Sequence, residues 1–124
     1  MTHKVILALG LVLMVAPIHA VEEKVKYDEE SYVANNLPEK SKQQYKQGNR
    51  LILEDKFKEA LSIMETLAKE HPDFPGAHRG MAICYARLGK ADPAVRAYKR
   101  YIELAPSAPD ANKVREIVQV YERK

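Results

Sequence analysis

His71, His78 and Cys84 are the side chains in the central part of this sequence best suited to metal binding or nucleophilic chemistry. Two imidazoles bind one zinc ion most simply when they share a helical face. Pro72 and Pro75 fall between the two histidines, and proline interrupts a helix, so we expect no shared face. The spacing therefore predicts no metal site.

Cys84 is the only cysteine, so it cannot form a disulfide within the chain. Its mostly apolar neighbours predict a small buried hydrophobe rather than a reactive thiol. The sequence holds no CxxC, HExxH or GxSxG motif and no glycine-rich phosphate loop. The carboxylates lie in polar or helix-capping contexts, where solvated surface is the ordinary interpretation. We therefore predict no catalytic residues, no cofactor and no enzymatic activity.

Composition favours one small helical domain. The 124 residues are 46% hydrophobic and 30% charged, with five glycines and no tryptophan, which suits soluble helices better than a β-sandwich or a disordered chain. The formal net charge is only +3, and basic and acidic residues are interspersed along the sequence. Nucleic-acid binding normally uses a basic stripe, so we expect no nucleic-acid partner.

Residues 1–20 have the pattern of an export signal. Lys4 supplies a positive charge, residues 5–15 form an apolar run, and Ala20 provides the small residue at a cleavage site. We predict cleavage after Ala20 and a periplasmic or secreted mature chain. The alternative is an uncleaved membrane anchor, although the run is shorter than the ~20 residues that span a bilayer. No other membrane contact is expected.

A period of 34 residues organises the remaining chain. Ala60 and Ala94 are separated by this interval, and so are Pro72 and Pro106. Positions between them agree in type, such as Met64 with Tyr98 and Leu67 with Tyr101. A fixed period of this length indicates a repeated helical hairpin.

Local signals divide each repeat into two helices. Ser41 and Gln44 have the spacing of a capping box, so the first helix is predicted to start near Ser41 or at Pro38 and to run to about Glu54. Apolar residues recur at intervals of three and four over 57–69, which predicts the second helix.

The later helices are predicted in the same way. Asp73 with Pro75, and Asp92 with Pro93, have the form of helix starts. A last helix is expected from Asp110, with four apolar residues on one face: Val114, Ile117, Val118 and Tyr121.

Residues 41–106 resemble two tetratricopeptide repeats, and the last helix resembles the half-repeat that often caps such arrays. The matching positions are Gly48 and Ala82, Ala60 and Ala94, Pro72 and Pro106, and the turn residue Gly89, which Asp55 replaces in the first unit. The resemblance implies an all-α fold in which helical hairpins stack as a short right-handed superhelix with a C-terminal capping helix. It places the repeat domain at 38–124, with repeats at about 41–74 and 75–108 and the cap at about 110–123. Residues 21–37 are then a linker or a short N-terminal helix.

The resemblance further implies a non-catalytic protein-interaction module, because stacked hairpins form a groove lined by the first helix of each hairpin. The groove positions map to Lys42, Tyr45, Lys46, Asn49, Arg79, Ile83 and Arg87, together with Ile52, Leu53 and Ala86. This mixture predicts an acidic, partly apolar peptide partner and a scaffold or adaptor role in the bacterial cell envelope. Alternatively, the charged members are ordinary solvated residues and the aliphatic ones belong to the core. Reversing the charges of Arg79 and Arg87 is expected to leave stability unchanged.

The family's clamp for a C-terminal carboxylate is not expected in this chain. Asn49 matches that motif, but Tyr45, Gly80 and Glu116 do not. A different role is self-assembly, because two repeats and a cap are close to the minimum for a stable stack. An apolar end covered by a second copy would make homo-oligomerisation the main function.

Overall fold

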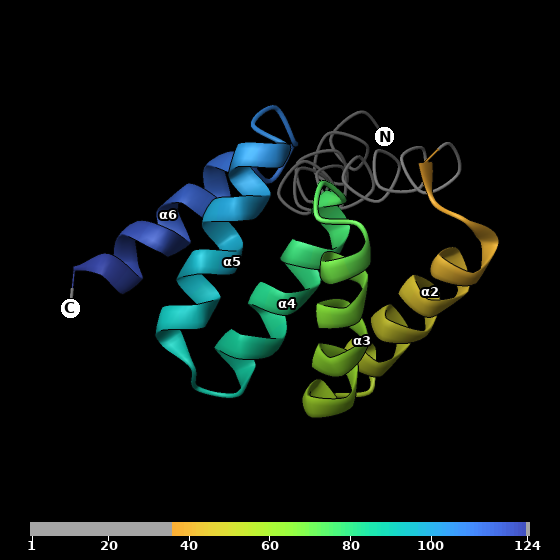
Figure 1. Cartoon of the computed structure of the whole chain (residues 1–124). Coiled ribbons are helices and arrows are strands. Elements are labelled where there is room, and N and C mark those ends of the chain that lie inside the picture. Colours follow the sequence, from red (N-terminus) through yellow and green to blue (C-terminus); the bar gives the residue numbers. More distant parts are fainter. Residues whose placement is uncertain (1–35, 124) are drawn as a thin grey trace, which may run out of the picture.

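The computed structural model describes residues 36–123, which fold into five helices in series. They are α2 (Glu39–Leu53), α3 (Phe57–Glu70), α4 (Pro75–Arg87), α5 (Ala91–Leu104) and α6 (Ala111–Glu122). Each helix packs against the next one along the chain, and α2 also packs against α4 (Figure 1). The predicted all-α stack of two hairpins and a final helix is confirmed. The predicted signal segment and residues 21–35 lie outside the described residues.

The hairpin turns repeat at the level of backbone hydrogen bonds. Asp55 and Gly89 adopt left-handed φ angles of 60° and 76°. In the first turn the Lys56 N–H donates to Leu51 O at 2.9 Å, and in the second the Lys90 N–H donates to Tyr85 O at 2.9 Å. This six-residue closure around a left-handed residue is the Schellman motif, which satisfies carbonyls at a helix end. Aspartate tolerates the conformation that glycine normally supplies.

The helix starts correct three sequence predictions. Pro38 is the N-cap of α2, so Ser41 lies inside the helix and the predicted capping box does not form. Ser41 is instead buried, and its hydroxyl hydrogen-bonds with His71 Nε2 at 3.0 Å, joining α2 to the end of α3. Phe74, not Asp73, is the N-cap of α4, although Pro75 occupies the first turn as predicted. Likewise Lys90, not Asp92, is the N-cap of α5, and Asp92 lies in the first turn of that helix.

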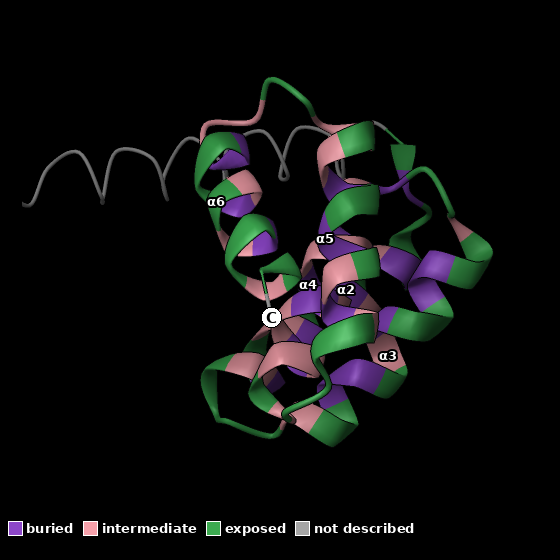
Figure 2. Ribbon diagram, turned by 90° about the vertical axis from the view of Figure 1, so that its left-hand side faces the viewer, coloured by how far each residue is buried: buried purple, intermediate pink, exposed green. Residues whose placement is uncertain are grey.

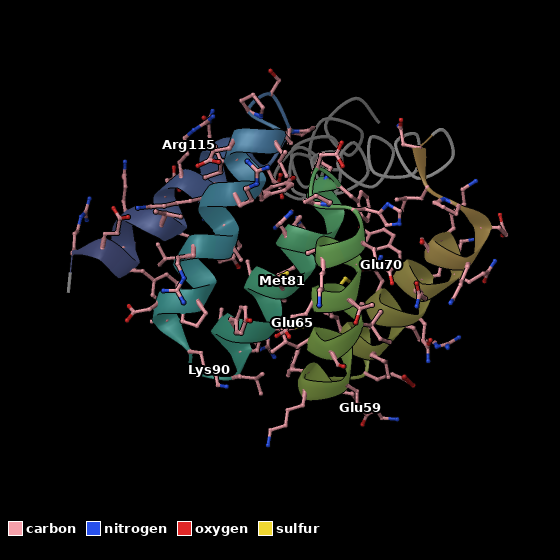
Figure 3. The ribbon with its side chains drawn as sticks, viewed as in Figure 1. Glu59, Glu65, Glu70, Met81, Lys90 and Arg115 are labelled. Carbon is pink, nitrogen blue, oxygen red and sulfur yellow. The ribbon has the colours of Figure 1, made fainter. Side chains whose placement is uncertain are left out.

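Three apolar clusters form a core that runs along the stack. The first joins α2, α3 and the start of α4, the second joins α4, α5 and α6, and the third lies near the first turn. Met81 of α4 packs against all three (Figure 3). Ala60 and Ala94, the matching alanines of the two repeats, are fully buried. Figure 2 shows that the buried residues face the interior of the stack and the exposed ones its outside.

Met64 of α3 is held between two glycines on neighbouring helices. A Cβ atom on Gly48 of α2 would lie 2.7 Å from Met64 Cε, and one on Gly80 of α4 would lie 2.7 Å from Met64 Sδ. At such distances the Met64 side chain or a helix would have to shift. The missing side chains therefore allow α2, α3 and α4 to approach closely.

Candidate functional site

The predicted groove positions form one accessible surface on α2 and α4. On each helix they recur at intervals of three and four residues, so they share a face. Most are partly or fully exposed, and the two helices pack against each other. We call this surface the α2–α4 face and define it by nine residues: Lys42, Lys46, Asn49, Ile52, Leu53, Arg79, Ile83, Ala86 and Arg87.

Tyr45 does not belong to this face, so its predicted place in the groove is wrong. Only 6% of its surface is exposed, and its ring packs edge-to-face on Phe74 with centroids 4.8 Å apart. A Cβ atom on Gly76 of α4 would lie 2.6 Å from Tyr45 Oη. The ring therefore fits against the α4 backbone because Gly76 has no side chain, and Tyr45 supports the face from within the core.

Arg79 already binds a carboxylate, but that carboxylate belongs to the chain itself. Its Nε donates to Asp110 Oδ2 at 2.8 Å, and the Tyr101 hydroxyl donates to Asp110 Oδ1 at 2.6 Å. Asp110 is 8% exposed and lies at the N-cap of α6. The three residues join α4, α5 and the start of α6. Arg79 therefore links α4 to the start of α6. It is not the isolated exposed charge that the sequence prediction assumes, so we expect reversal of its charge to reduce stability.

The joint before α6 is closed by further polar contacts. Arg115 donates to the Pro106 carbonyl at 3.1 Å and to Asn112 Oδ1 at 2.8 Å. Lys99 of α5 pairs with Glu122 near the other end of α6. The bond to Pro106 ties α6 to the connection before it, and the Lys99–Glu122 pair joins α6 to α5.

Arg87 lies at the opposite end of the α2–α4 face. Its guanidinium is 4.9 Å from the centre of the Phe57 ring, and its NH2 nitrogen is 3.8 Å from Asp55 Oδ1. Both side chains of the ion pair are largely exposed, so the pair contributes little to stability. Unlike Arg79, Arg87 remains available at the surface.

The remaining members of the face combine charge with apolar area. Lys46 is exposed, whereas Lys42 is half-buried with its Nζ 3.9 Å from Glu39. Leu53 is 85% exposed, the largest value among the large hydrophobic residues of the described chain. Ile52 and Ile83 are half-buried. The face therefore presents partly exposed aliphatic side chains beside basic ones.

The first helices of the two hairpins, α2 and α4, differ in charge from the second helices, α3 and α5. The net charge of +3 does not reveal this difference. Helices α2 and α4 carry six basic residues (Lys40, Lys42, Lys46, Arg50, Arg79 and Arg87) and one acidic residue, Glu39. Helices α3 and α5 carry five basic and five acidic residues. Figure 3 shows three of these acids, Glu59, Glu65 and Glu70, along α3. The basic excess is thus confined to the helices that form the candidate site.

The residues considered first for chemistry have structural partners. His71 bonds to Ser41, and His78 Nε2 lies 2.8 Å from the Pro72 carbonyl oxygen. Cys84 is fully buried, as predicted, and this burial, with a smaller effect of Glu65, raises the pKa of its thiol to about 11. Among residues 36–123 no three His, Cys, Asp or Glu side chains are grouped to hold a metal ion.

Comparison with known proteins agrees with the architecture. Stacked antiparallel helix pairs with a 34-residue period define a helical-repeat protein. A family model described as tetratricopeptide repeat matches residues 47–119, which is more than half of the chain. The chain therefore belongs to the tetratricopeptide-repeat family, whose members generally mediate protein–protein interactions. Neither the curated proteins nor the solved structures gave a significant match. Between residues 36 and 123, no helix is both long and apolar enough to cross a bilayer.

Proposed function

We propose that this protein is a non-catalytic scaffold or adaptor of the bacterial cell envelope that binds an acidic, partly apolar protein segment on the α2–α4 face. The observation that carries the proposal is the coincidence of two properties on this face. Four of the six basic residues of α2 and α4 lie on it, although Arg79 is bound to Asp110, and it exposes Leu53 beside Ile52 and Ile83. Nucleic acid, membrane and cofactors have no place in this proposal.

The two properties have separate roles in binding. Burial of aliphatic side chains contributes about 25 cal/mol per Å² of apolar area removed from water. Lysine and arginine at the rim accelerate encounter with an acidic segment and select against basic ones. Binding should therefore weaken with added salt, because exposed charges are screened within about 10 Å at 0.1 M ionic strength.

The envelope location rests on residues 1–20, which lie outside the described residues. The signal-like pattern there supports export, and loss of this segment would leave Val21 as the first residue. The intact mass of periplasmic protein tests this directly. Retention of Met1 in the membrane fraction would support an anchor instead.

The binding proposal is tested by capture from an envelope extract with two matched double variants. The variant Lys46→Glu, Arg87→Glu reverses one exposed charge on α2 and one on α4. Lys69→Glu with Arg96→Glu makes the same change on α3 and α5. We expect the first variant to recover about tenfold less partner than the native chain, and the second to recover the native amount. Equal loss in both variants would contradict binding on the α2–α4 face.

Self-assembly is a second candidate, favoured by one observation at the end of the stack. Val120 of α6 is 58% exposed, and the neighbouring Ile117 is half-buried. A second copy could cover both. The solution mass decides between the candidates, because a monomer at high concentration leaves self-assembly without support.

A further inference from the structure

The residues that precede the described structure have the chemistry that the α2–α4 face is proposed to bind. Residues 21–35 contain five acids (Glu22, Glu23, Asp28, Glu29 and Glu30) and two lysines. Tyr27, Tyr32 and Val33 add apolar area within the same stretch. The segment is thus acidic and partly apolar, and it is opposite in charge to α2 and α4.

The structure shows where the C-terminal end of this segment joins the described chain. Leu37 is 6% exposed and belongs to the same core cluster as Tyr45 and Phe74. It therefore fixes the chain at the N-terminal end of α2. Both α2 and α4 are the first helices of their hairpins, so their N-termini lie along the same edge of the stack (Figure 1). The segment consequently joins the described chain beside one end of the α2–α4 face.

The segment is also long enough to follow the whole face. Tyr27 and Leu37 are ten positions apart, and a fully extended chain spans at most about 3.3–3.6 Å per residue, so the segment can reach roughly 33 Å. Helix α2 has 15 residues, which corresponds to about 22 Å at 1.5 Å per residue. Residues 27–36 can therefore pass Lys42 and Lys46 and reach Leu53.

We propose that residues 22–33 dock on the α2–α4 face of their own chain and act as an intramolecular competitor for the partner. This inference rests on the proposed function of the face. The acids of the segment meet the lysine and arginine side chains, while Tyr27, Tyr32 and Val33 cover the aliphatic ones. A short tether gives an effective concentration in the millimolar range, so a weak interaction suffices to occupy the face. An external partner then binds in proportion to the fraction of molecules whose face is open.

Spin labelling of the exported protein tests where the segment lies. A nitroxide is attached at Glu30→Cys in a Cys84→Ala background, and the amide signals of the chain are recorded by NMR. We expect broadening at Lys46, Asn49 and Ile83, and sharp signals at Thr66 on α3. About 0.5 M salt should reduce the broadening, since it screens the charges. Absence of broadening on α2 and α4, or equal broadening of Thr66, would overturn the proposal.

A mixed sample separates this arrangement from docking between two copies. Isotope-labelled native chain is mixed with unlabelled, spin-labelled chain, so any broadening arises between molecules. The proposal predicts none. Broadening of the α2–α4 face in the mixture would assign the segment to a second copy instead.

Competition is measured with a synthetic peptide of residues 22–35 as the probe. The variant Asp28→Asn, Glu29→Gln, Glu30→Gln removes three charges from the segment, and Asp92→Asn, Glu59→Gln, Glu70→Gln removes three exposed charges from α3 and α5. If the segment occupies nine of ten faces, the first variant should bind the peptide about tenfold more tightly than the native chain, and the second should match the native chain.

The outcomes separate this inference from the proposed function. Equal affinity of the native chain and the first variant, or no peptide binding by either, would overturn self-docking. Neither result affects the extract experiment, which varies only residues of the helices. Loss of the difference between its two variants would instead reject the face as a partner site.

Discussion

The two ends of the repeat stack differ in one prominent contact each. At the first seam, Met64 of α3 fills the space that Gly48 and Gly80 leave open, and the contact is entirely apolar. At the last joint, the buried carboxylate of Asp110 receives hydrogen bonds from Arg79 and Tyr101. The first arrangement depends on volume, and the second depends on charge and hydrogen bonding.

This difference explains how one helix row can serve two purposes. The charged residues of the α2–α4 face take no part in the contact of Met64 with Gly48 and Gly80, so they are not required for packing there. Arg79 is the exception, because it reaches across to the polar joint. Enlarging Gly80 should therefore act through lost space at the first seam, whereas removing the Asp110 carboxylate should act through lost hydrogen bonds at the last joint.

The largest effect is expected from Gly80→Val. A Cβ atom at this position would already lie 2.7 Å from Met64 Sδ and 2.9 Å from Met64 Cγ, so the added branches force α4 away from α3. We expect a loss of about 3 kcal/mol in the free energy of unfolding. Urea denaturation measures it, with Gly89→Ala, whose Cβ atom meets no neighbour but stands at a positive φ, as a control for backbone strain without a clash. If Met64→Ala does not relieve part of the loss, the clash with Met64 is not its cause.

Removing the carboxylate at the last joint should have the next largest effect. Asp110→Ala leaves Arg79 Nε and the buried Tyr101 hydroxyl without this acceptor, which should cost about 2–3 kcal/mol. The exposed Asp92→Ala is the matched control and should change stability by less than about 0.5 kcal/mol. Arg79→Glu should destabilise the fold, whereas Arg87→Glu should not. Equal melting temperatures for these two arginine variants would contradict a stabilising role for the contact between Arg79 and Asp110.

Enlarging the repeat alanines compares the two hairpins directly. Ala60→Leu and Ala94→Leu each place a larger side chain at a fully buried helix contact. Each should cost on the order of 1–3 kcal/mol through overpacking. Thermal melting of both variants provides the measurement. Unchanged melting of both would argue against the hairpin packing described above.

The smallest predicted effect is a loss of stability at high pH. The pKa of Cys84 is about 11 in the folded chain and ordinarily 9.0, so the unfolded chain loses this proton first as pH rises. Stability should therefore decrease from pH 9 towards 11, by about 1–2 kcal/mol. Burial also raises the pKa of Tyr85 and Tyr98, which extends the decrease in the same direction.

Cys84→Ala separates the thiol from the tyrosines. The variant should lose less stability than the native chain between pH 9 and 10, because only the tyrosines then contribute. Urea denaturation at several pH values provides the comparison. Parallel curves for the two proteins would show that the buried thiol has no such role.

The fold was predictable because its signals are local or periodic. The 34-residue interval, the turn residues Asp55 and Gly89 and the apolar faces of the helices all agree with the structure. The contacts that assign roles to the site residues are not periodic. Arg79 and Asp110 are 31 residues apart, and nothing in the sequence pattern pairs them.

Tyr45 illustrates the same limit. An aromatic residue at a groove position can face the solvent or the core, and here Gly76 on another helix decides between them. The difference in charge between α2 with α4 and α3 with α5 depends on which helix holds each charged residue, and the composition alone does not show it. Local sequence therefore predicted the scaffold, while the site required the tertiary contacts.

Site-specific photo-cross-linking in growing cells tests the central claim most directly. A photoreactive phenylalanine analogue at Asn49 lies on the α2–α4 face, and the same analogue at Thr66 lies on the exposed side of α3. We predict that Asn49 yields a discrete adduct with another protein, and that Thr66 does not. Adducts from Thr66 alone would contradict the account, because they would place partner binding on α3 rather than on the α2–α4 face.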